Sequence, residues 1–373
     1  MKRVIRRIIR YANLLFALLL ALSFLSPGIS PQKVWLPSFL GLAYPYILAM
    51  NLAFMVFWIV MKKREFIISF LAILLGWHTL TRYVGLHPAT MFRQSYFESL
   101  GPQERESEKL MKVMSFNVRA FDQYGWAKSP STRKDIIQML SAEDPDILCL
   151  QEFYVAEGGP YGSGDLFRAL DRIPNRHLTY TIRRGRNQYG IAIFSQYPIL
   201  AKGEVNINST MSICSFADIR IRDDTVRVYN MHLQSTRLNS QHYRFLDSLK
   251  FRYDNQQMEE FRDISYRLRD AFITRAGQAD RIADHIARCP YPLIICGDFN
   301  DTPVSYTYKR ISKGLRDAFV ECGLGIGRTY IGRFPSFRID YIFYSSRIKA
   351  RHYARKRVHL SDHFPIEAYL QLD

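Results

Sequence analysis

The chain has 373 residues, of which 48% are hydrophobic and 14% aromatic, and its formal net charge is +17. This composition excludes an intrinsically disordered chain, and the length allows one large domain or two domains of ordinary size. The positive charge suits any polyanionic partner, such as nucleic acid, a phosphorylated small molecule or an anionic lipid head group, and equally a solvated surface with a basic bias.

The mean hydropathy of −0.14 averages two unlike parts of the chain. Met1–Pro102 is mostly apolar and holds 11 basic and 2 acidic residues, whereas Gln103–Asp373 holds the remaining 40 basic and 32 acidic residues. The five cysteines show neither a CxxC motif nor a Cys/His metal spacing. We therefore expect an apolar first part and a polar second part without a zinc site.

Three apolar stretches, Tyr11–Ile29, Val34–Met61 and Phe66–Thr81, precede residue 90. A membrane-spanning helix needs about 20 apolar residues, which the first two stretches supply and the third reaches only when it extends to Leu86. The alternative for the first stretch is a cleaved signal peptide, but Leu22–Ser26 offers no small-x-small cleavage site. The pattern predicts an all-α transmembrane region of three helices within residues 1–100, which anchors the chain in a lipid bilayer.

Two basic clusters, Met1–Arg10 and Lys62–Arg64, flank the first two stretches. The positive-inside rule places both clusters in the cytoplasm. A third span then carries everything after residue 90 outward, which predicts an integral protein of a bacterial inner membrane with its polar part on the extracytoplasmic side. If Phe66–Leu86 lies in the membrane interface instead, the polar part stays in the cytoplasm.

The segment 101–109 (GPQERESEK) is short and charged and is predicted to be a linker to a domain at 110–373. In that domain apolar strand-like runs greatly outnumber helix-like ones, of which Ser131–Leu140 and Gln278–Arg288 are the clearest. This favours an α/β fold: a four-layer α/β sandwich of two packed, mostly antiparallel β-sheets flanked by helices. The strand-like runs are Leu110–Val118, Asp146–Phe153, Gly190–Ser195, Ile213–Arg222, Thr225–Leu233, Pro292–Gly297, Ile339–Tyr344 and Ile366–Leu372.

Polar side chains follow these runs directly, at the ends of six expected strands. One such residue is an ordinary turn residue, but acids, amides and imidazoles at six strand ends argue against coincidence. Side chains on one rim of a rigid scaffold are well placed to bind a ligand. They are Asn117, Glu152, His232, Asp298, Asn300, Asp340, Asp362 and His363.

Seven segments around these residues resemble, in the same order, the signature set of the endonuclease/exonuclease/phosphatase superfamily. That superfamily includes pancreatic deoxyribonuclease, repair endonucleases, neutral sphingomyelinases and inositol-polyphosphate 5-phosphatases. The segments are MSFNVR around Asn117, LCLQEF around Glu152, GIAIFS at Gly190–Ser195, YNMHLQS around His232, IICGDFND around Asp298 and Asn300, RIDYIF around Asp340, and SDHFPI at Ser361–Ile366.

A phosphoester is anionic, so it repels a nucleophile, and a hard cation held by oxygen ligands relieves this repulsion. Mg²⁺ prefers one or two carboxylates together with water and substrate phosphate. Glu152, with Asp362 and Asn117, supplies such an open oxygen site, in which Mn²⁺ can substitute for Mg²⁺.

The resemblance implies roles for the other residues. Asp298 would orient or deprotonate the attacking water, and Asn300 would donate a hydrogen bond to a phosphoryl oxygen. Asp340 would pair with His363 and fix its tautomer. His232 would contact the phosphate or assist the leaving group, which argues against the repair branch. Either Asp298 or His363 is the base.

Residues 236–274 depart from the family pattern and predict one or two inserted amphipathic helices. Their apolar residues recur at helical spacing, from Phe245 and Leu249 through Met258 and Phe261 to Phe272. These helices pack on their own domain, or form a lid or membrane-facing surface that selects the substrate.

The sequence thus predicts a membrane-anchored Mg²⁺-dependent hydrolase of phosphoester bonds, with a nuclease-type phosphodiesterase as first choice. One alternative is a phosphodiesterase or phosphatase for a lipid head group or an inositol phosphate, because the anchor holds the site near a bilayer. An alternative of another class is a non-catalytic membrane-bound binding protein on the same fold.

Overall fold

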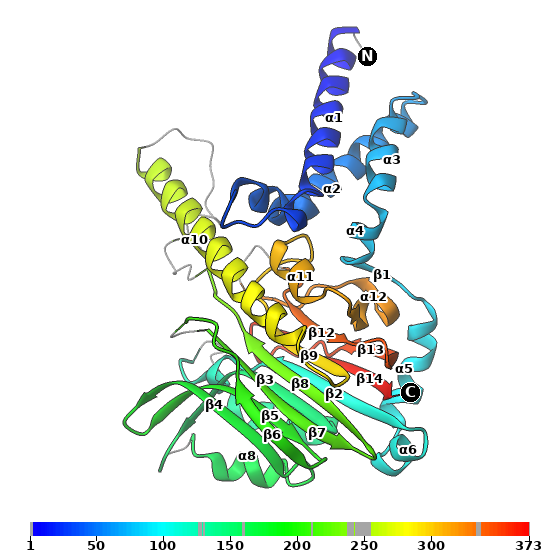
Figure 1. Cartoon of the computed structure of the whole chain (residues 1–373). Helices are drawn as coiled ribbons and strands as arrows, with labels where there is room; N and C mark the ends of the chain where they lie inside the picture. Colours follow the sequence, from blue (N-terminus) through cyan, green and yellow to red (C-terminus); the bar gives the residue numbers. More distant parts are fainter. Residues whose placement is uncertain are drawn as a thin grey trace.

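Two six-stranded β-sheets pack face to face, and helices cover their outer faces (Figure 1). A helical N-terminal part stands at one end of this sandwich. The prediction of two packed, mostly antiparallel sheets flanked by helices is confirmed. The computed structural model describes residues 3–125, 129, 131–158, 161–209, 212–236, 242, 255–332 and 337–372.

Each sheet contains one parallel strand pair, β2–β3 or β8–β9, among antiparallel neighbours. The first sheet has the order β13 (Ile348–Arg355), β14 (Ile366–Leu372), β2 (Leu110–Asn117), β3 (Ile147–Ala156), β5 (Asn187–Ser195) and β4 (Asn175–Arg184). The second sheet has the order β10 (Arg316–Asp317), β12 (Asp340–Tyr344), β9 (Leu293–Asp298), β8 (Asp224–His232), β7 (Ile213–Ile221) and β6 (Ile199–Glu204).

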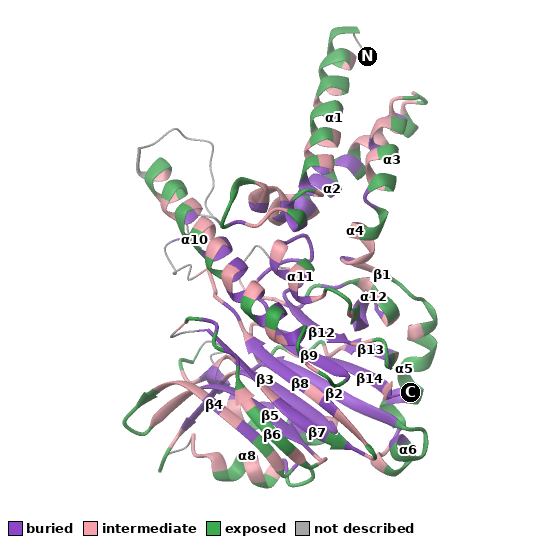
Figure 2. Ribbon diagram, viewed as in Figure 1, coloured by how far each residue is buried: buried purple, intermediate pink, exposed green. Residues whose placement is uncertain are grey.

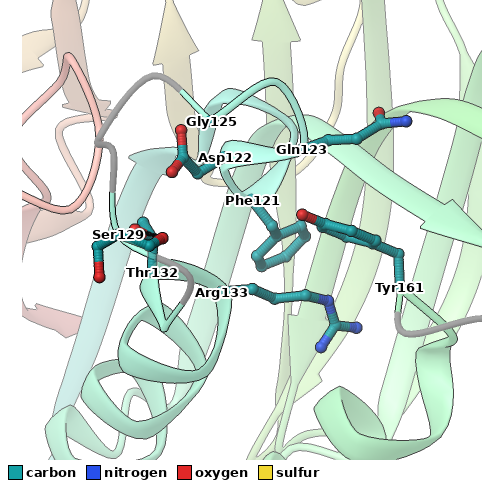
Figure 3. A pocket seen from close by; sticks show the side chains of 8 residues that line it. All are labelled: Phe121, Asp122, Gln123, Gly125, Ser129, Thr132, Arg133 and Tyr161. Atoms are coloured by element: carbon teal, nitrogen blue, oxygen red, sulfur yellow. Dashed lines mark hydrogen bonds between the residues drawn. The ribbon is translucent and has the colours of Figure 1, made fainter.

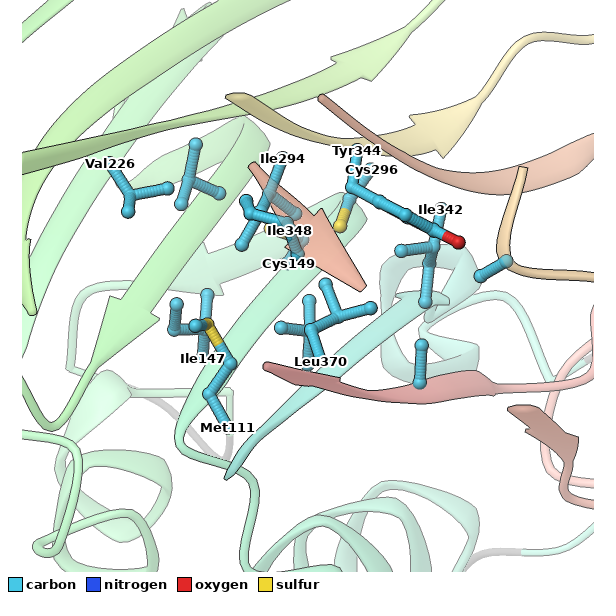
Figure 4. Close-up of a cluster of buried hydrophobic side chains, with 14 of the residues drawn as sticks. Met111, Ile147, Cys149, Val226, Ile294, Cys296, Ile342, Tyr344, Ile348 and Leu370 are labelled. Atoms are coloured by element: carbon cyan, nitrogen blue, oxygen red, sulfur yellow. The ribbon is translucent and has the colours of Figure 1, made fainter. Parts of the chain in front are cut away.

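The core between the sheets is built from the continuous apolar runs of the central strands (Figure 4). Because both faces of these strands are covered, nearly every residue of β2, β9 and β12 is buried. The strands therefore form a rigid support for the side chains at their ends. The first sheet contributes Met111, Ile147 and Cys149, among others, and the second contributes Val226, Ile294, Cys296 and Ile342.

Helices cover the outer face of each sheet and complete the four layers (Figure 2). On the first sheet, Ile136 and Leu140 of α7 (Thr132–Glu143) are fully buried, and α8 (Ser163–Ala169) packs beside them. On the second sheet, Ile282 of α10 (Asn255–Ile286) and Ile311 of α11 (Tyr306–Ile311) join the core. A further helix on the sandwich is α12 (Ala318–Cys322).

The helix α10 differs from the sequence prediction, which separated the 236–274 insertion from a helix at Gln278–Arg288. The structure instead has one continuous helix of 32 residues. The stretch contains no proline and one glycine, Gly277, which costs only about 1 kcal/mol in a helix interior. A Cβ on Gly277 would collide with the side chain of Gln32, so the glycine allows close packing. Phe245 and Leu249 of the predicted insertion lie outside the described residues.

The N-terminal part contains two helices that are long and apolar enough to cross a membrane, at Arg3–Gly28 and Leu36–Val60. The first comprises α1 (Arg3–Ser23) and η1 (Ser26–Gly28), and the second is α2. The third apolar stretch forms α3 (Phe66–Leu75), whose ten residues are about 15 Å long, half of a hydrocarbon core of about 30 Å.

By length and composition, two helices could each cross a membrane alone, and the third stretch forms two short helices in place of the expected third span. The third stretch is interrupted at Gly76, where a Cβ would overlap the ring of Phe24, and it continues as the short α4 (Trp77–Thr81). The hydropathy of the stretch gives no sign of this packing constraint.

Polar side chains tie α3 to the other two helices. The Ser69 hydroxyl lies 2.6 Å from Asn13 Oδ1 and 3.0 Å from Asn51 Oδ1. The amide of Asn51 also donates to the Phe16 carbonyl at 2.9 Å. Buried hydrogen bonds of this kind join helices in an apolar environment, so α1, α2 and α3 form one bundle.

The bundle and the sandwich are joined by ordered structure. β1 (Val84–Leu86) pairs with β11 (Leu324–Ile326), and α5 (Ala89–Ser99) and α6 (Pro102–Ser107) follow. The expected linker at 101–109 thus contains a helix, and its buried Arg105 binds Asp146 with a nitrogen–oxygen distance of 2.8 Å. This contact fixes the segment on the first sheet.

His352 of β13 is buried beneath α5. Its ring stacks on Phe97 with a centroid distance of 4.9 Å, and neither ring nitrogen has a hydrogen-bond partner in the part of the chain that the structure describes. Burial lowers the pKa of His352 to about 4.

This burial predicts a pH-dependent stability. Because the pKa in the folded state lies below that in the unfolded state, the stability is fully present above about pH 6.5 and is lost as the pH falls toward 4. We expect wild type to lose about 2 kcal/mol more unfolding free energy between pH 7 and pH 5 than His352→Leu does. Thermal unfolding of both proteins in detergent checks this, and equal losses would contradict it.

Candidate active site

The strand pairing brings five of the sequence-predicted residues to one edge of the sandwich. In the parallel pairs, Asn117 lies opposite Gln151, the neighbour of Glu152, and His232 lies opposite Asp298. The antiparallel partner of Asp298 on β12 is Asp340. Parallel strands end at the same edge of a sheet. The topology therefore brings the Asn117 amide close to Glu152 and the His232 imidazole close to Asp298.

Asp298 lies at the centre of this group and is only 1% exposed. Its Oδ2 accepts a hydrogen bond from the Asn117 amide at 3.0 Å, and the Nε2 atoms of His363 and His232 lie 3.6 and 3.7 Å from it. Its Oδ1 accepts from the backbone N–H of Asn300 at 2.8 Å. Burial raises the pKa of Asp298 above the usual range of an aspartate.

His363 and Asp340 form a buried pair. The imidazole Nδ1 lies 2.9 Å from Asp340 Oδ2, and the Thr329 hydroxyl accepts the backbone N–H of Asp340 at 3.1 Å. Burial alone lowers the pKa of a histidine, but the carboxylates of Asp340 and Asp298 outweigh it and raise the pKa of His363 above its usual value. His363 is therefore a cation held between two carboxylates.

Glu152 reaches the site through an irregularity in β3. The pairing of β3 with β5 shifts register between Leu150 and Phe153, and Glu152 adopts a left-handed backbone with φ of 48°. Such bulges re-aim side chains beside functional sites. The Glu152 side chain is 39% exposed and its Oε1 accepts from the Asn117 amide at 3.1 Å. It is thus a carboxylate that points into the site and remains open to solvent.

Asn300 and Asp362 complete the predicted set at the rim. Asn300 is also left-handed, with φ of 51°, and its amide donates to the Leu233 carbonyl at 3.1 Å. The Asp362 carboxylate pairs with the Arg119 guanidinium at 3.0 Å, and burial raises the pKa of Asp362. All eight predicted residues therefore lie at the same end of the sandwich, with Asp362 facing an arginine.

The arrangement fits a divalent cation near Glu152. The amide nitrogen of Asn117 lies within 3.1 Å of carboxylate oxygens of both Glu152 and Asp298, and Nε2 of His232 lies 3.7 Å from the same two oxygens. Two carboxylates that converge in this way call for a positive partner. Glu152 offers an accessible carboxylate of the kind that Mg²⁺ prefers, whereas Asn117 turns its amide nitrogen toward this carboxylate and its Oδ1 accepts from the Arg119 backbone N–H at 3.0 Å.

A second group of ligand-type atoms comes from Asp298, Asp340 and His363, which lie within 4.8 Å of one another. Here Nδ1 of the imidazole is engaged by Asp340, and the neighbouring carboxylates raise the pKa of His363, which disfavours the neutral form that ligates a metal. This group is therefore better suited to holding and moving a proton.

A cleft of about 600 Å³ opens beside Glu152 and His232. Its walls include Tyr124 and Tyr189, whose hydroxyls lie 2.9 Å apart, together with the apolar Ile182. The ring of Tyr154 packs behind Tyr189 at a centroid distance of 4.6 Å. The cleft therefore offers an aromatic and apolar surface to whatever group is attached to a phosphate at the site.

A smaller pocket of about 250 Å³ lies near the turn that follows β2 (Figure 3). The guanidinium of Arg133 lies over the rings of Tyr161 and Phe121, at 5.5 and 5.7 Å from their centroids. None of the eight predicted residues lines this pocket. The cleft beside Glu152 is therefore the candidate substrate-binding site.

The sequence did not reveal the role of Arg275 of α10, whose side chain binds two segments at the rim of the site. This arginine is 1% exposed and binds Asp301 Oδ2 at 3.2 Å and the Gln234 carbonyl at 2.8 Å. A single arginine on the apolar face of an amphipathic helix was the available signal. Tyr124 and Tyr189 gave no such signal, because tyrosines are frequent throughout the chain.

Comparison with known proteins agrees with this geometry. The family model described as "Endonuclease/Exonuclease/phosphatase family" matches residues 114–363, and a model described as "Domain of unknown function (DUF8431)" matches residues 6–83. No curated protein sequence matches the chain.

Solved structures share the fold of the sandwich. An endonuclease/exonuclease/phosphatase from Bacteroides vulgatus is 18% identical, with a TM-score of 0.52, over 71% of this chain and 99% of that one. A family protein from Bacteroides thetaiotaomicron is 20% identical, with a TM-score of 0.50, over 71% of this chain and 95% of that one. The N-terminal bundle is outside the 114–363 match.

The position of Asp298 depends on Gly297, which predicts a structural sensitivity. A Cβ on Gly297 would overlap the carbonyl oxygen of Met231 on the neighbouring β8. We expect Gly297→Ala to cost about 2 kcal/mol or more of unfolding free energy, because β9 must move away from β8. Gly164→Ala on α8, where nothing lies within 4 Å, is the control and should be neutral or slightly stabilising. Equal effects of the two substitutions on thermal unfolding would contradict the packing assigned to Gly297.

Proposed function

Because the chain belongs to the endonuclease/exonuclease/phosphatase family, whose members are hydrolases acting on phosphoester bonds, we propose that it is a membrane-anchored phosphoester hydrolase that depends on a divalent cation. The observation that supports this best is the convergence of Glu152 and Asp298 on the same amide and imidazole, beside the cationic His363. A binding protein on the same fold would have no need of this costly buried charge.

Glu152 would hold the cation, with Asp362 adding negative charge nearby, and Asn117 would join as a ligand after its amide turns Oδ1 away from the Arg119 N–H and toward the site. When bound, Mg²⁺ or Mn²⁺ neutralises negative charge that develops on the phosphate. The ion pair of Asp362 with Arg119 keeps that second carboxylate in place at the rim. Among the carboxylates of Glu152, Asp298 and Asp362, that of Glu152 is the most exposed to solvent. It is therefore the one that a cation from solvent reaches first.

Asp298 is the better candidate for the base that accepts a proton from the attacking water. His363 is held in its charged form by Asp340 and so has no lone pair to accept a proton. Burial raises the pKa of Asp298 toward neutrality, which suits a general base. The charged His363, through Nε2, and the second N–H of the Asn300 amide would donate hydrogen bonds to phosphoryl oxygens.

His232 is placed to act on the leaving-group side. It lines the cleft of about 600 Å³ together with Glu152, and its Nε2 faces both Glu152 and Asp298. A group attached to the phosphate would lie against Tyr124 and Tyr189 of that cleft. An aromatic surface of this kind accepts a nucleobase, which keeps the nuclease-type phosphodiesterase as one candidate, and it accepts an apolar group equally well.

The membrane anchor is proposed to consist of α1 and α2, whose outward faces carry many exposed apolar side chains. The N-terminus and the start of α3 lie at the end of the bundle that is far from the sheets (Figure 1). The basic residues within 3–10 and 62–64 are located there, so the positive-inside rule favours an extracytoplasmic sandwich. The chain returns toward the sandwich through α3 and α4, so these two short helices together would make the third crossing that this orientation requires.

The role of Asp298 is tested by Asp298→Asn, which keeps the shape and removes the proton acceptor. We expect turnover of a soluble phosphodiester to fall about 10²- to 10⁴-fold, with unchanged circular dichroism. Asp165→Asn, at a carboxylate that is 67% exposed on α8, is the matched control and should retain full turnover. If Asp298→Asn keeps wild-type turnover, the base is elsewhere.

The role of Glu152 is tested through the cation requirement. We expect EDTA to abolish turnover and Mg²⁺ or Mn²⁺ to restore it. Glu152→Gln removes the accessible anionic ligand, so the Mg²⁺ concentration for half-maximal rate should rise about tenfold or more. Glu157→Gln, on an exposed acid just beyond β3, is the control. An unchanged Mg²⁺ dependence in Glu152→Gln would rule out Glu152 as a cation ligand.

A further inference from the structure

The loop that follows Asn300 packs directly on the membrane anchor. Val304 of this loop lies in one apolar cluster with Leu20 of α1 and Tyr44 of α2. A Cβ on Gly41 of α2 would overlap the Val304 carbonyl oxygen, so the helix approaches the loop as closely as a glycine allows. Val304, only four residues after Asn300 of the site, therefore contacts a helix that is proposed to lie in the bilayer.

The strand that carries Asp340 also begins against the N-terminal part. Arg338, two residues before Asp340, is buried, pairs with Asp317 and donates to the Arg82 carbonyl at 2.9 Å. The ring of Phe337 lies beside the ring of Tyr46 at a centroid distance of 6.4 Å. The segment that follows β9 and the segment that precedes β12 thus both contact the N-terminal part.

The helix α10 links the rim of the site to the anchor a third time. Its Arg275 binds the segments that follow His232 and Asn300, through Gln234 and Asp301. One turn earlier, Phe272 packs edge-on against Phe39 of α2 with a centroid distance of 5.3 Å. The rim, α10 and α2 therefore form one continuous packed unit.

Beyond Phe272, α10 continues toward Asn255 and exposes apolar side chains at the level of the turn between α1 and α2 (Figure 1). Met258 and Phe261 are each 60% exposed. They lie one turn apart on the same face, with Phe261 about 16 Å and Met258 about 21 Å along the helix from the contact of Phe272 with Phe39. Arg262 follows directly, and basic side chains beside exposed apolar ones are typical of a helix that lies in a membrane interface.

We propose that the active site faces the bilayer and that its substrate is a phosphoester carried by a membrane lipid, with Met258 and Phe261 of α10 in contact with the lipid head-group region. This inference rests on the hydrolase function proposed above. The exposed apolar faces of α1 and α2 place lipid beside the rim, and the apolar wall at Ile182 and Tyr189 suits the lipid-borne side of such a substrate.

Charge favours a lipid over a nucleic acid at this surface. Glu259 and Glu260 lie between Met258 and Phe261, and a long polyanion laid across the exposed end of α10 would meet these acids.

The experiment uses the full chain reconstituted in phospholipid vesicles with Mg²⁺. The lipid substrates, supplied one at a time in the same vesicles, are a phospholipid diester, a phosphatidic acid and a polyprenyl diphosphate; the soluble ones are bis(p-nitrophenyl) phosphate and DNA. The variant M258E/F261E places charge on the exposed end of α10. The matched control is Leu200→Glu, at an apolar side chain that is 53% exposed on β6.

We expect wild type to hydrolyse at least one lipid substrate. M258E/F261E should lower the ratio of lipid turnover to bis(p-nitrophenyl) phosphate turnover about tenfold or more, because burying these two side chains in lipid is worth several kcal/mol. Leu200→Glu should leave that ratio unchanged. If wild type cleaves no substrate at all, the hydrolase proposal itself fails.

Other outcomes overturn the lipid proposal alone. Cleavage of DNA and bis(p-nitrophenyl) phosphate without cleavage of any lipid would identify a nuclease whose site does not serve the bilayer. An unchanged ratio in M258E/F261E, with wild-type thermal unfolding, would remove α10 from the membrane surface.

Discussion

The site depends on the burial of two carboxylates beside one imidazole. Asp298 and Asp340 are each shielded from water, and charges in such a place must be neutralised locally. His363 lies between them, and their charge raises its pKa, so the imidazole offsets part of the buried negative charge. Glu152, adjacent through Asn117, adds an accessible carboxylate. A divalent cation would neutralise part of the remaining negative charge.

The backbone around this charge group is strained, and the sheets hold it. Glu152, Asn300 and the turn Arg119–Asp122 all have left-handed backbones although none is glycine. Each such residue costs roughly 1–2 kcal/mol. They lie directly after or within β2, β3 and β9, whose other residues are buried in the core between the sheets. The free energy gained by burying the core therefore offsets the cost of the left-handed backbone at the rim.

The sequence predicts this rim because the central strands are recognisable as runs rich in apolar residues that stop at a polar residue. The runs before Asn117, His232 and Asp298 show this, and the topology of the parallel pairs then brings their ends together. Edge strands do not have this pattern. Most residues of β4 and β6 are partly or fully exposed, so the sequences of these strands mix polar and apolar residues. Neither strand could therefore be distinguished from a loop in the sequence.

Long-range packing explains the other differences between expectation and structure. The third apolar stretch is long enough by composition to approach a span, but it is interrupted at Gly76, which packs against the ring of Phe24. Gly277 of α10 packs against Gln32, and the rim is supported by the ion pair of Arg275 with Asp301. Each of these is a contact between residues far apart in the chain, which periodicity cannot reveal.

The contacts between the N-terminal bundle and the sandwich determine which substrates can reach the site. A sandwich on a flexible linker would turn freely, and its site would face solvent and membrane in turn. Here α6 is fixed by Arg105 on Asp146, Arg338 binds the carbonyl of Arg82, and Val304 packs among α1 and α2. These contacts hold one orientation, with the rim next to the anchor. A substrate confined to the same bilayer would then meet the site by diffusion in two dimensions, at an effective concentration that no soluble substrate shares.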